Sequence, residues 1–206
     1  LPHMLSTLGP KLAVGDVNKD GIEDIFIGGA KGSAGGIYLQ TRSGRFIKSN
    51  KIALQSDAFS EDMGAIFFDA DGDRDLDLYV VSGGNEFEKT DPALKDRLYI
   101  NSGKGNFFKS KNNLPDFTSS GSVVKAHDFD NDGDQDLFVG GRVLPNEYPF
   151  APNSYLLENN GKGIFKDVTG EKAPGLKNIG MVSDALWTDY NGDNQMDLML
   201  VGEWMP

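Results

Sequence analysis

The amino-acid sequence predicts an all-β protein in which four-stranded antiparallel sheets repeat along the chain. The first observation is a nine-residue acidic segment that occurs four times, with starts 53, 59 and 61 residues apart. The second is an apolar, strand-like stretch on each side of every acidic segment. The third is the content of 26 glycines, which break short strands. A four-stranded sheet that recurs every ~40 to 60 residues is typical of a β-propeller blade.

The four acidic segments are predicted to be hairpin turns. They read DVNKDGIED, DADGDRDLD, DFDNDGDQD and DYNGDNQMD, and they begin at Asp16, Asp69, Asp128 and Asp189. Each follows an apolar stretch (KLAV, GAIFF, SVVKAH or SDALWT) and precedes another (IFIGG, LYVVSGG, LFVGG or LMLVG). Because β-branched and aromatic residues favour strands, we expect a strand A before each segment and a strand B after it.

Two shorter strands, C and D, are expected after strand B in the first three repeats. They read GIYLQ and RFIKS, RLYIN and NFFKS, and SYLLE and GIFKDV, and glycine-containing turns separate them. Phe46, Phe107 and Phe165 occupy matching places after these turns. Strands A and B are almost continuously apolar, which predicts that neighbouring sheets cover both of their faces.

The repeat units cover about residues 10–50, 62–111, 121–169 and 180–206, and the last unit contains strands A and B only. A closed propeller usually has ~4 to 8 blades. We therefore expect the 206 residues to form one fragment, a partial β-propeller, with further blades in a longer parent chain.

Oxygen-bearing side chains recur at positions 1, 3, 5 and 9 of each acidic segment, which we call carboxylate loops 1 to 4. Calcium takes ~6 to 8 oxygen ligands and is held by loops that combine such side chains with a backbone carbonyl at position 7. The sequence therefore predicts up to four Ca²⁺ sites in the A–B hairpins. The predicted ligands are Asp16, Asn18, Asp20, the Ile22 carbonyl and Asp24 in loop 1, and Asp69, Asp71, Asp73, the Asp75 carbonyl and Asp77 in loop 2. In loops 3 and 4 they are Asp128, Asp130, Asp132, the Asp134 carbonyl and Asp136, and Asp189, Asn191, Asp193, the Gln195 carbonyl and Asp197.

Position 6 of such a loop needs a sharp turn, for which Gly21, Gly133 and Asn194 are suited. Arg74 is the exception, and it predicts strain in loop 2 unless Gly72 lets that loop turn differently.

Other interpretations of the carboxylate loops are weaker. Asp, Asn and Gly are ordinary turn residues, so one such loop would indicate a plain turn as readily as a metal site, but four with the same spacing favour metal. An EF-hand is excluded because its loop lies between helices and ends in Glu at position 12. Position 12 is Ile27, Val80, Val139 and Leu200 here, each within an expected strand. The absence of cysteine and of a histidine cluster disfavours a transition metal.

The acidity of the chain is local. The net charge is −11, and more than half of the 31 acidic residues lie in the four carboxylate loops. No basic stripe is present, so nucleic acid is not expected as a partner. No run approaches the ~18 apolar residues of a membrane span.

The segments LAVGDVNKDGIEDIFIGG, VVKAHDFDNDGDQDLFVGG and LLENNGKGIFKDVT resemble FG-GAP/VCBS repeats, and the resemblance covers almost the whole chain. It implies an integrin-alpha-like propeller, usually seven-bladed, with calcium in the A–B hairpins and an extracellular, cell-surface or periplasmic location. The run of repeats ending in GEWMP is also similar to bacterial VCBS proteins with an ASPIC/UnbV region, which would follow Pro206. The resembled family includes adhesion modules, carbohydrate-associated proteins and some lyases.

The long B-to-C connections, GGNEFEKTDPALKDR and GGRVLPNEYPFAPNS, should emerge at the end of the sheets opposite the carboxylate loops. Arg142, Glu147, Tyr148 and Phe150 form a candidate patch for a glycan or protein partner at a cell surface. The alternative is that the prolines stiffen a connector and the aromatic residues cap the core.

No catalytic residue is predicted. The two histidines, His3 and His127, show no catalytic pattern, and no G-x-S-x-G segment occurs. We therefore expect a calcium-stabilised binding, adhesion or scaffold module. The alternative is the propeller portion of a polysaccharide-active enzyme, a lyase or hydrolase, with its catalytic residues elsewhere in the full protein.

Overall fold

The fold is all-β, with four antiparallel sheets that follow one another along the chain. The computed structural model describes residues 9–49 and 54–205. The expected unit ends at residues 50 and 206, together with His3, lie outside these ranges. In chain order, the first two sheets contain β1 (Leu12–Gly15), β2 (Asp24–Ile27), β3 (Gly36–Gln40) and β4 (Phe46–Lys48), then β5 (Glu61–Phe68), β6 (Asp77–Gly83), β7 (Arg97–Asn101) and β8 (Phe107–Lys109). The other two contain β9 (Ser120–His127), β10 (Asp136–Val143), β11 (Tyr155–Glu158) and β12 (Lys166–Asp167), then β13 (Met181–Thr188) and β14 (Asp197–Glu203).

Within residues 9–49 and 54–205, helical structure is confined to short segments between strands. They are three 3₁₀ turns, Leu54–Asp57, Pro92–Leu94 and Pro174–Leu176, and the single-turn helix α1, Thr169–Lys172. In the first three sheets each strand pairs with the next strand in sequence, which is the order expected for strands A to D. The prediction of four-stranded antiparallel blades is therefore confirmed.

Each carboxylate loop is the turn of an A–B hairpin, as the sequence predicts. The last pair of the hairpin ladder joins the residue before the loop to the aspartate at position 9. These pairs are Gly15 with Asp24, Phe68 with Asp77, His127 with Asp136, and Thr188 with Asp197.

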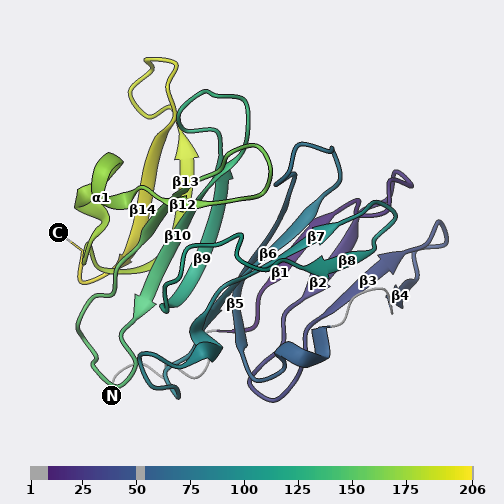
Figure 1. Cartoon of the computed structure of the whole chain (residues 1–206), viewed down its shortest axis with the longest axis horizontal. Helices are drawn as coiled ribbons and strands as arrows, with labels where there is room; N and C mark the ends of the chain where they lie inside the picture. Colours follow the sequence, from purple (N-terminus) through teal and green to yellow (C-terminus); the bar gives the residue numbers. More distant parts are fainter. Residues whose placement is uncertain (1–8, 50–53, 206) are drawn as a thin grey trace.

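The sheets lie side by side like the blades of a partial propeller, from β1–β4 on one side to β13–β14 on the other (Figure 1). An apolar core fills each space between neighbouring sheets. The first contains Phe26, Ile37 and Phe107, the second Val124 and Phe165, and the third contains Phe138, Leu156 and Val182. In the described part of the chain the sheets do not close into a ring.

Both faces of a sheet are covered only in the middle of the array. All residues of β6 and β10 are buried, as their apolar sequences predict. The prediction fails for the two outer sheets, where Leu12 is 60% exposed and Val201 is 54% exposed. The physical reason is that each outer sheet has a neighbour on one face only. Phe46 is accordingly 47% exposed, whereas Phe107, at the matching place in the second sheet, is buried.

Candidate metal-binding hairpins

The four carboxylate loops share one backbone conformation. Positions 4 and 6 have a positive φ in every loop, a conformation that a side chain disfavours. These φ values are 60° and 82° for Lys19 and Gly21, 79° and 67° for Gly72 and Arg74, 62° and 100° for Asn131 and Gly133, and 77° and 66° for Gly192 and Asn194. Loop 2 therefore turns as the others do, and Arg74 is held in the conformation that glycine adopts in loops 1 and 3.

Two carboxylates of each loop accept hydrogen bonds from backbone N–H groups of the same loop. The aspartate at position 1 accepts a hydrogen bond from the backbone N–H of position 6, at 2.8 to 3.0 Å in the four loops. The aspartate at position 5 accepts one from the N–H of position 7, at 2.8 to 3.2 Å. Local hydrogen bonds from backbone N–H groups to Asp side chains are the reason that the chain turns here.

The aspartate at position 9 ties the loop to the sheet. One of its oxygens accepts from the backbone N–H of position 2, at 2.8 to 3.2 Å. In the first three sheets the other oxygen accepts a hydrogen bond from a backbone N–H at the end of strand C, at 2.7 or 2.8 Å. The donors are Gln40, Asn101 and Asn159. Asp77 and Asp136 are almost fully buried, and this burial raises the pKa of each to about 7.

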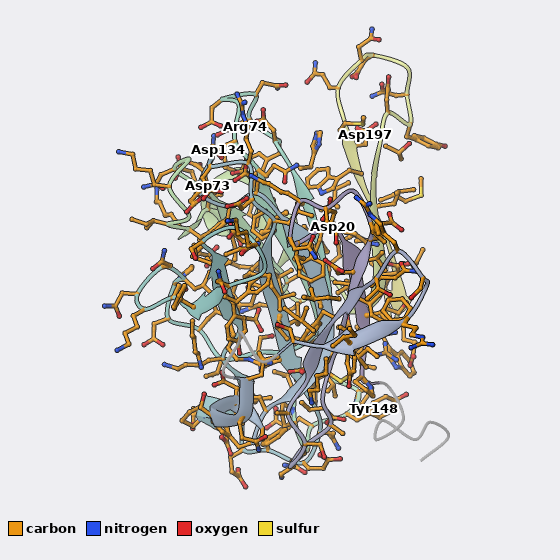
Figure 2. The ribbon with its side chains drawn as sticks, turned by 90° about the vertical axis from the view of Figure 1, so that its right-hand side faces the viewer. Asp20, Asp73, Arg74, Asp134, Tyr148 and Asp197 are labelled. Atoms are coloured by element: carbon orange, nitrogen blue, oxygen red, sulfur yellow. The ribbon has the colours of Figure 1, made fainter. Side chains whose placement is uncertain are left out.

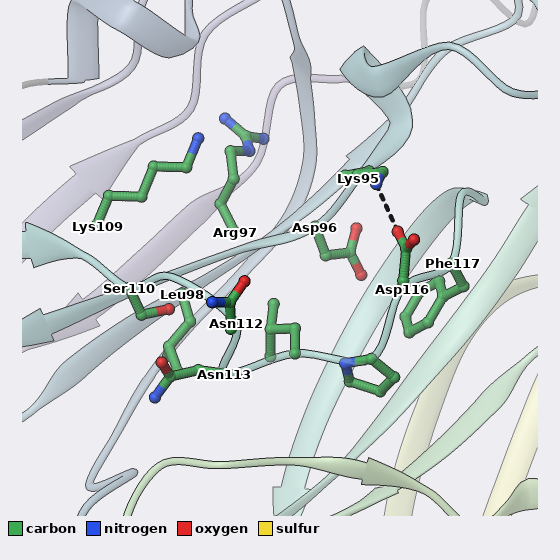
Figure 3. A pocket seen from close by; sticks show the side chains of 12 residues that line it. Lys95, Asp96, Arg97, Leu98, Lys109, Ser110, Asn112, Asn113, Asp116 and Phe117 are labelled. Atoms are coloured by element: carbon green, nitrogen blue, oxygen red, sulfur yellow. Dashed lines mark hydrogen bonds and ion pairs between the residues drawn. The ribbon is translucent and has the colours of Figure 1, made fainter.

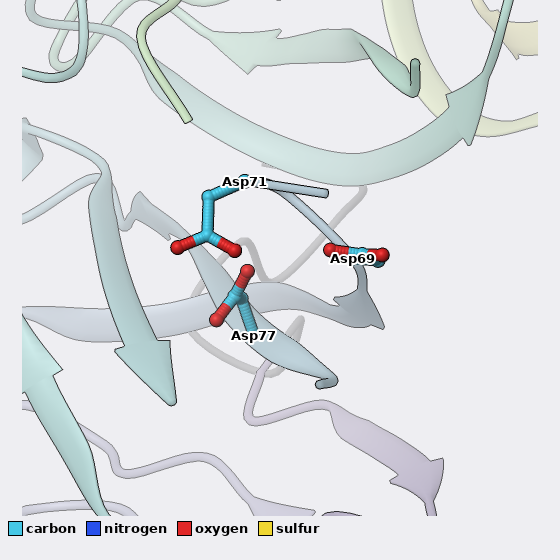
Figure 4. Close-up of side chains that lie close together, drawn as sticks. All are labelled: Asp69, Asp71 and Asp77. Atoms are coloured by element: carbon cyan, nitrogen blue, oxygen red, sulfur yellow. The ribbon is translucent and has the colours of Figure 1, made fainter. Parts of the chain in front are cut away.

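Positions 1, 3 and 9 come together in loops 2 and 3. One carboxylate oxygen from each of Asp69, Asp71 and Asp77 lies within 4.8 Å of the other two (Figure 4). Asp128, Asp130 and Asp136 form the equivalent cluster. In loops 1 and 4 position 3 is asparagine, so positions 1, 3 and 9 offer two carboxylates and one amide there.

These clusters contain carboxylate oxygens that have no hydrogen-bond partner in the part of the chain that the structure describes. Oδ1 of Asp71 and Oδ1 of Asp130 are buried and accept no hydrogen bond from the described residues. Burial and the neighbouring carboxylates raise the pKa of Asp71. A buried carboxylate without a partner is costly, and a cation bound among the three oxygens would remove that cost. The donor set, which is all oxygen, fits a hard divalent cation.

Position 7 places its side chain outside the cluster. In loops 2 and 3 it is Asp75 and Asp134, whose carboxylates lie against the glycines of their own C–D turns, Gly103 and Gly161. Asp75 also forms an ion pair with Lys19 of loop 1. Backbone carbonyls at this position, and the side chains at position 5, remain predicted ligands.

A contact between neighbouring hairpins was not anticipated from the sequence. The side-chain amide of Asn101 donates to the carbonyl of Val17 in loop 1, at 2.9 Å, and to that of Leu76 in loop 2, at 3.1 Å. Asn159 repeats this bridge with Ala70 and Gln135, at 2.8 and 3.1 Å. The available signal was an asparagine at the end of strand C or directly after it, just before the glycine-containing turn of each repeat.

The other candidate patch lies at the opposite end of the sheets, where Figure 2 shows Tyr148 far from the labelled loop residues Asp20, Asp73, Asp134 and Asp197. Phe150 is 66% exposed, and Glu147 pairs with Lys89 of the preceding connection at 2.5 Å.

The structure does not place Arg142 on this surface. Its guanidinium is buried against β13 and β14, where it bonds the Met181 carbonyl at 3.0 Å and Glu203 at 2.5 Å. Sequence reasoning instead missed Trp204, which is 66% exposed and donates from Nε1 to the Tyr148 hydroxyl at 3.3 Å.

Comparison with known families identifies the repeat. The model of a family described as an FG-GAP-like repeat matches residues 16–80 and 81–139, which include carboxylate loops 1 to 3. A search of the curated proteins finds no match. Within the described ranges, no helix is long and apolar enough to cross a membrane.

Proposed function

The chain belongs to the FG-GAP-like repeat family, and we propose that it is a calcium-stabilised binding module that works outside the cytoplasm. The observation that carries the proposal is the pair of three-carboxylate clusters, each with a buried oxygen that has no partner within the described chain. Asp16, Asn18 and Asp24, and Asp189, Asn191 and Asp197, would hold further ions in loops 1 and 4. In this proposal the ion offsets part of the negative charge of each loop and fixes the hairpin.

Calcium suits these loops better than other cations. It accepts many oxygen ligands in flexible geometry, whereas magnesium demands octahedral geometry and retains water. Sites of this kind in extracellular modules bind at ~10⁻⁴ to 10⁻³ M, a concentration range of calcium found outside cells. An extracellular, cell-surface or periplasmic location therefore accompanies the calcium proposal.

The end opposite the carboxylate loops is proposed to face the partner, a glycan or a protein. Long connections on a rigid scaffold are common binding surfaces. Tyr148, Phe150 and Trp204 expose aromatic surface there, beside the charged side chain of Glu147. Binding by this end leaves the calcium loops free to act as structural elements.

Thermal unfolding in saturating Ca²⁺, in saturating Mg²⁺ and after EGTA treatment tests the calcium role. Binding to the native state alone stabilises by ~2.7 kcal/mol per site at a hundredfold excess over Kd, so calcium should raise Tm by several degrees more than magnesium does. An identical Tm in all three conditions would refute the proposal.

Asp130→Asn provides a sharper test, because it gives loop 3 the asparagine that loops 1 and 4 already have at position 3. The variant should fold and should bind one of its calcium ions at least tenfold more weakly by titration calorimetry. Glu23→Gln is the matched control, since it removes an exposed carboxylate from position 8 of loop 1, which is not a predicted ligand. Equal losses of affinity in the two variants would mean that overall charge, and not coordination, governs binding.

A further inference from the structure

A hollow of about 360 Å³ lies at the rim of the second sheet (Figure 3). It is formed by β7, β8 and the segment 110–117 that leads to β9. Because β7 begins and β8 ends on this side, the hollow lies at the end of the sheet opposite carboxylate loop 2. Its size is at the small end of the range for ligand pockets, ~300 to 1,000 Å³.

The wall of the hollow contains a polar pair that the neighbouring sheets lack. Asp96 lines the hollow, and its Oδ2 accepts a hydrogen bond from the hydroxyl of buried Tyr79 at 2.8 Å. The strand registers place Tyr79 level with Phe26 in the first sheet and Phe138 in the third, and Asp96 level with Gly35 and Ser154. The second sheet thus has a tyrosine and an aspartate where the others have a phenylalanine and a small residue.

The backbone contact of Asp96 does not require a carboxylate. Its Oδ1 accepts from the backbone N–H of Ser82 at 2.8 Å, and in the third sheet the Ser154 hydroxyl accepts from the equivalent N–H, that of Gly141, at 3.0 Å. A serine is therefore sufficient for this backbone contact, and the second oxygen of Asp96 serves only the Tyr79 hydroxyl within the described chain. Burial raises the pKa of Asp96 to about 7, which shows that its ionised form is held at a cost.

Polar groups that face the hollow remain available. A carboxylate has about four lone-pair positions, and Asp96 uses two of them within the protein. The side chains of Ser110 and Asn112 also line the hollow and make no hydrogen bond with the described residues. Leu114 and the ring of Phe117, which is stacked on Tyr155 with centroids 4.0 Å apart, add apolar surface.

The cations around the hollow are already paired. Arg97 forms an ion pair with Asp62 at 2.7 Å, and Lys109 forms one with Asp57. Lys95 pairs with Asp116 across the mouth at 2.5 Å (Figure 3). Among the described residues that line the hollow, each of the three cations therefore has a carboxylate partner, and none is free to balance a phosphate, sulfate or uronate group. The lining thus favours an uncharged ligand.

We propose that this hollow, with Asp96, Ser110 and Asn112 as its hydrogen-bonding groups, binds a neutral sugar residue of a polysaccharide. Adjacent sugar hydroxyls both donate and accept, which matches a carboxylate, a hydroxyl and an amide grouped beside an apolar surface. The Tyr79 hydroxyl orients Asp96 for this contact. The inference rests on the proposed glycan partner, but the site is separate from the carboxylate loops and does not require bound calcium.

The test is a titration of the ¹⁵N-labelled 206-residue chain with neutral gluco-, galacto- and manno-configured disaccharides, and with digalacturonate. We expect at least one neutral disaccharide to shift the amide signals of Ser110 and Asn112, with digalacturonate binding at least tenfold more weakly. Shifts confined to other parts of the chain, stronger binding of digalacturonate, or no binding of any disaccharide would overturn the proposal.

Two variants connect the binding to the named groups. Tyr79→Phe combined with Asp96→Ser installs the pair found in the third sheet, and it should keep the fold while weakening binding at least tenfold. Asn112→Gly should weaken binding severalfold, whereas Asn178→Gly, at an exposed asparagine with a similar positive φ far along the chain, should not. Unchanged binding in the double variant and in Asn112→Gly would refute the assignment. Calcium-dependent Tm, measured on the same samples, reports on the carboxylate loops independently.

Discussion

Replacing Asn101 by alanine should weaken the second sheet and the first carboxylate loop together. The substitution removes the two hydrogen bonds from the Asn101 amide, at 2.9 Å to Val17 and at 3.1 Å to Leu76. Both carbonyls lie in carboxylate loops, and Val17 is only 1% exposed. A buried acceptor left without a partner costs ~1 to 3 kcal/mol. Because Leu76 is only partly buried, its carbonyl should contribute at the low end, and the two together should cost about 2 to 4 kcal/mol.

Urea unfolding with and without saturating Ca²⁺ measures this cost. For a chain of this length the expected loss corresponds to a fall in Tm of roughly 5 to 15 °C. Calcium binding to loop 1 should also weaken, because Val17 lies between the predicted ligands Asp16 and Asn18. Asn106→Ala is the matched control, since its amide makes one bond of 3.2 Å within its own turn and should cost less than about 1 kcal/mol. Equal costs for the two variants would refute the view that the bridge between loops is what matters.

Three further predictions concern positions at which the residue type or its burial differs between the repeats. Arg74 has a positive φ, which costs a residue with a side chain ~1 to 2 kcal/mol, and Arg74→Gly removes this cost. Glycine also adds conformational freedom to the unfolded chain, so differential scanning calorimetry should show a net gain in stability of about 0.5 to 1 kcal/mol. Phe107→Ala should lose about 3 to 4 kcal/mol in urea unfolding and Phe46→Ala less than half of that, because Phe107 is buried and Phe46 is 47% exposed; similar losses would contradict the arrangement of the sheets. Because the pKa of Asp96 is raised from 3.8 to about 7, its protonation contributes stability that is present below pH 4 and lost as pH rises through 7. In the double variant Tyr79→Phe, Asp96→Ser, the free energy of unfolding should fall by about 2 kcal/mol less between pH 4 and pH 7 than in the unsubstituted chain; this value is reduced because solvent reaches Asp96. An unchanged pH dependence of stability would contradict the prediction.

The hairpins could be predicted from the sequence because every signal for them is local. The strand-forming residues, the loop spacing and the turn residues all lie within about twenty positions, so the period of the pattern determines the A–B hairpin and its register. The strain at Arg74 was predictable for the same reason. The sequence left open how loop 2 would turn, and the structure shows that Arg74 follows the other loops because Asp69 accepts from its N–H at 2.9 Å.

The features that the sequence did not reveal depend on contacts between sheets. Arg142 stands at the start of a connection that looks exposed in the sequence, but its partner Glu203 lies 61 residues further on in the last strand. Phe46 matches Phe107 in the repeat, and its exposure follows from its place in the outer sheet. The Asn101 bridge requires the carbonyl of Val17, 84 residues earlier in the chain, to lie within reach of strand C. Such placements follow from how sheets stack, which repeat spacing alone does not specify.

The bridges between sheets also bear on how calcium would act along the array. Asn101 connects loops 1 and 2, and Asn159 connects loops 2 and 3, so an ion that fixes one loop also fixes a carbonyl acceptor for its neighbour. When the first ion has ordered one loop, the second ion binds a neighbouring loop that is already partly ordered and loses less conformational entropy. Calcium should therefore bind loops 1 to 3 with positive cooperativity, and Asn159→Ala should reduce the coupling between loops 2 and 3 in a calorimetric titration. Independent binding isotherms in the unsubstituted chain would show that each hairpin responds to its ion alone.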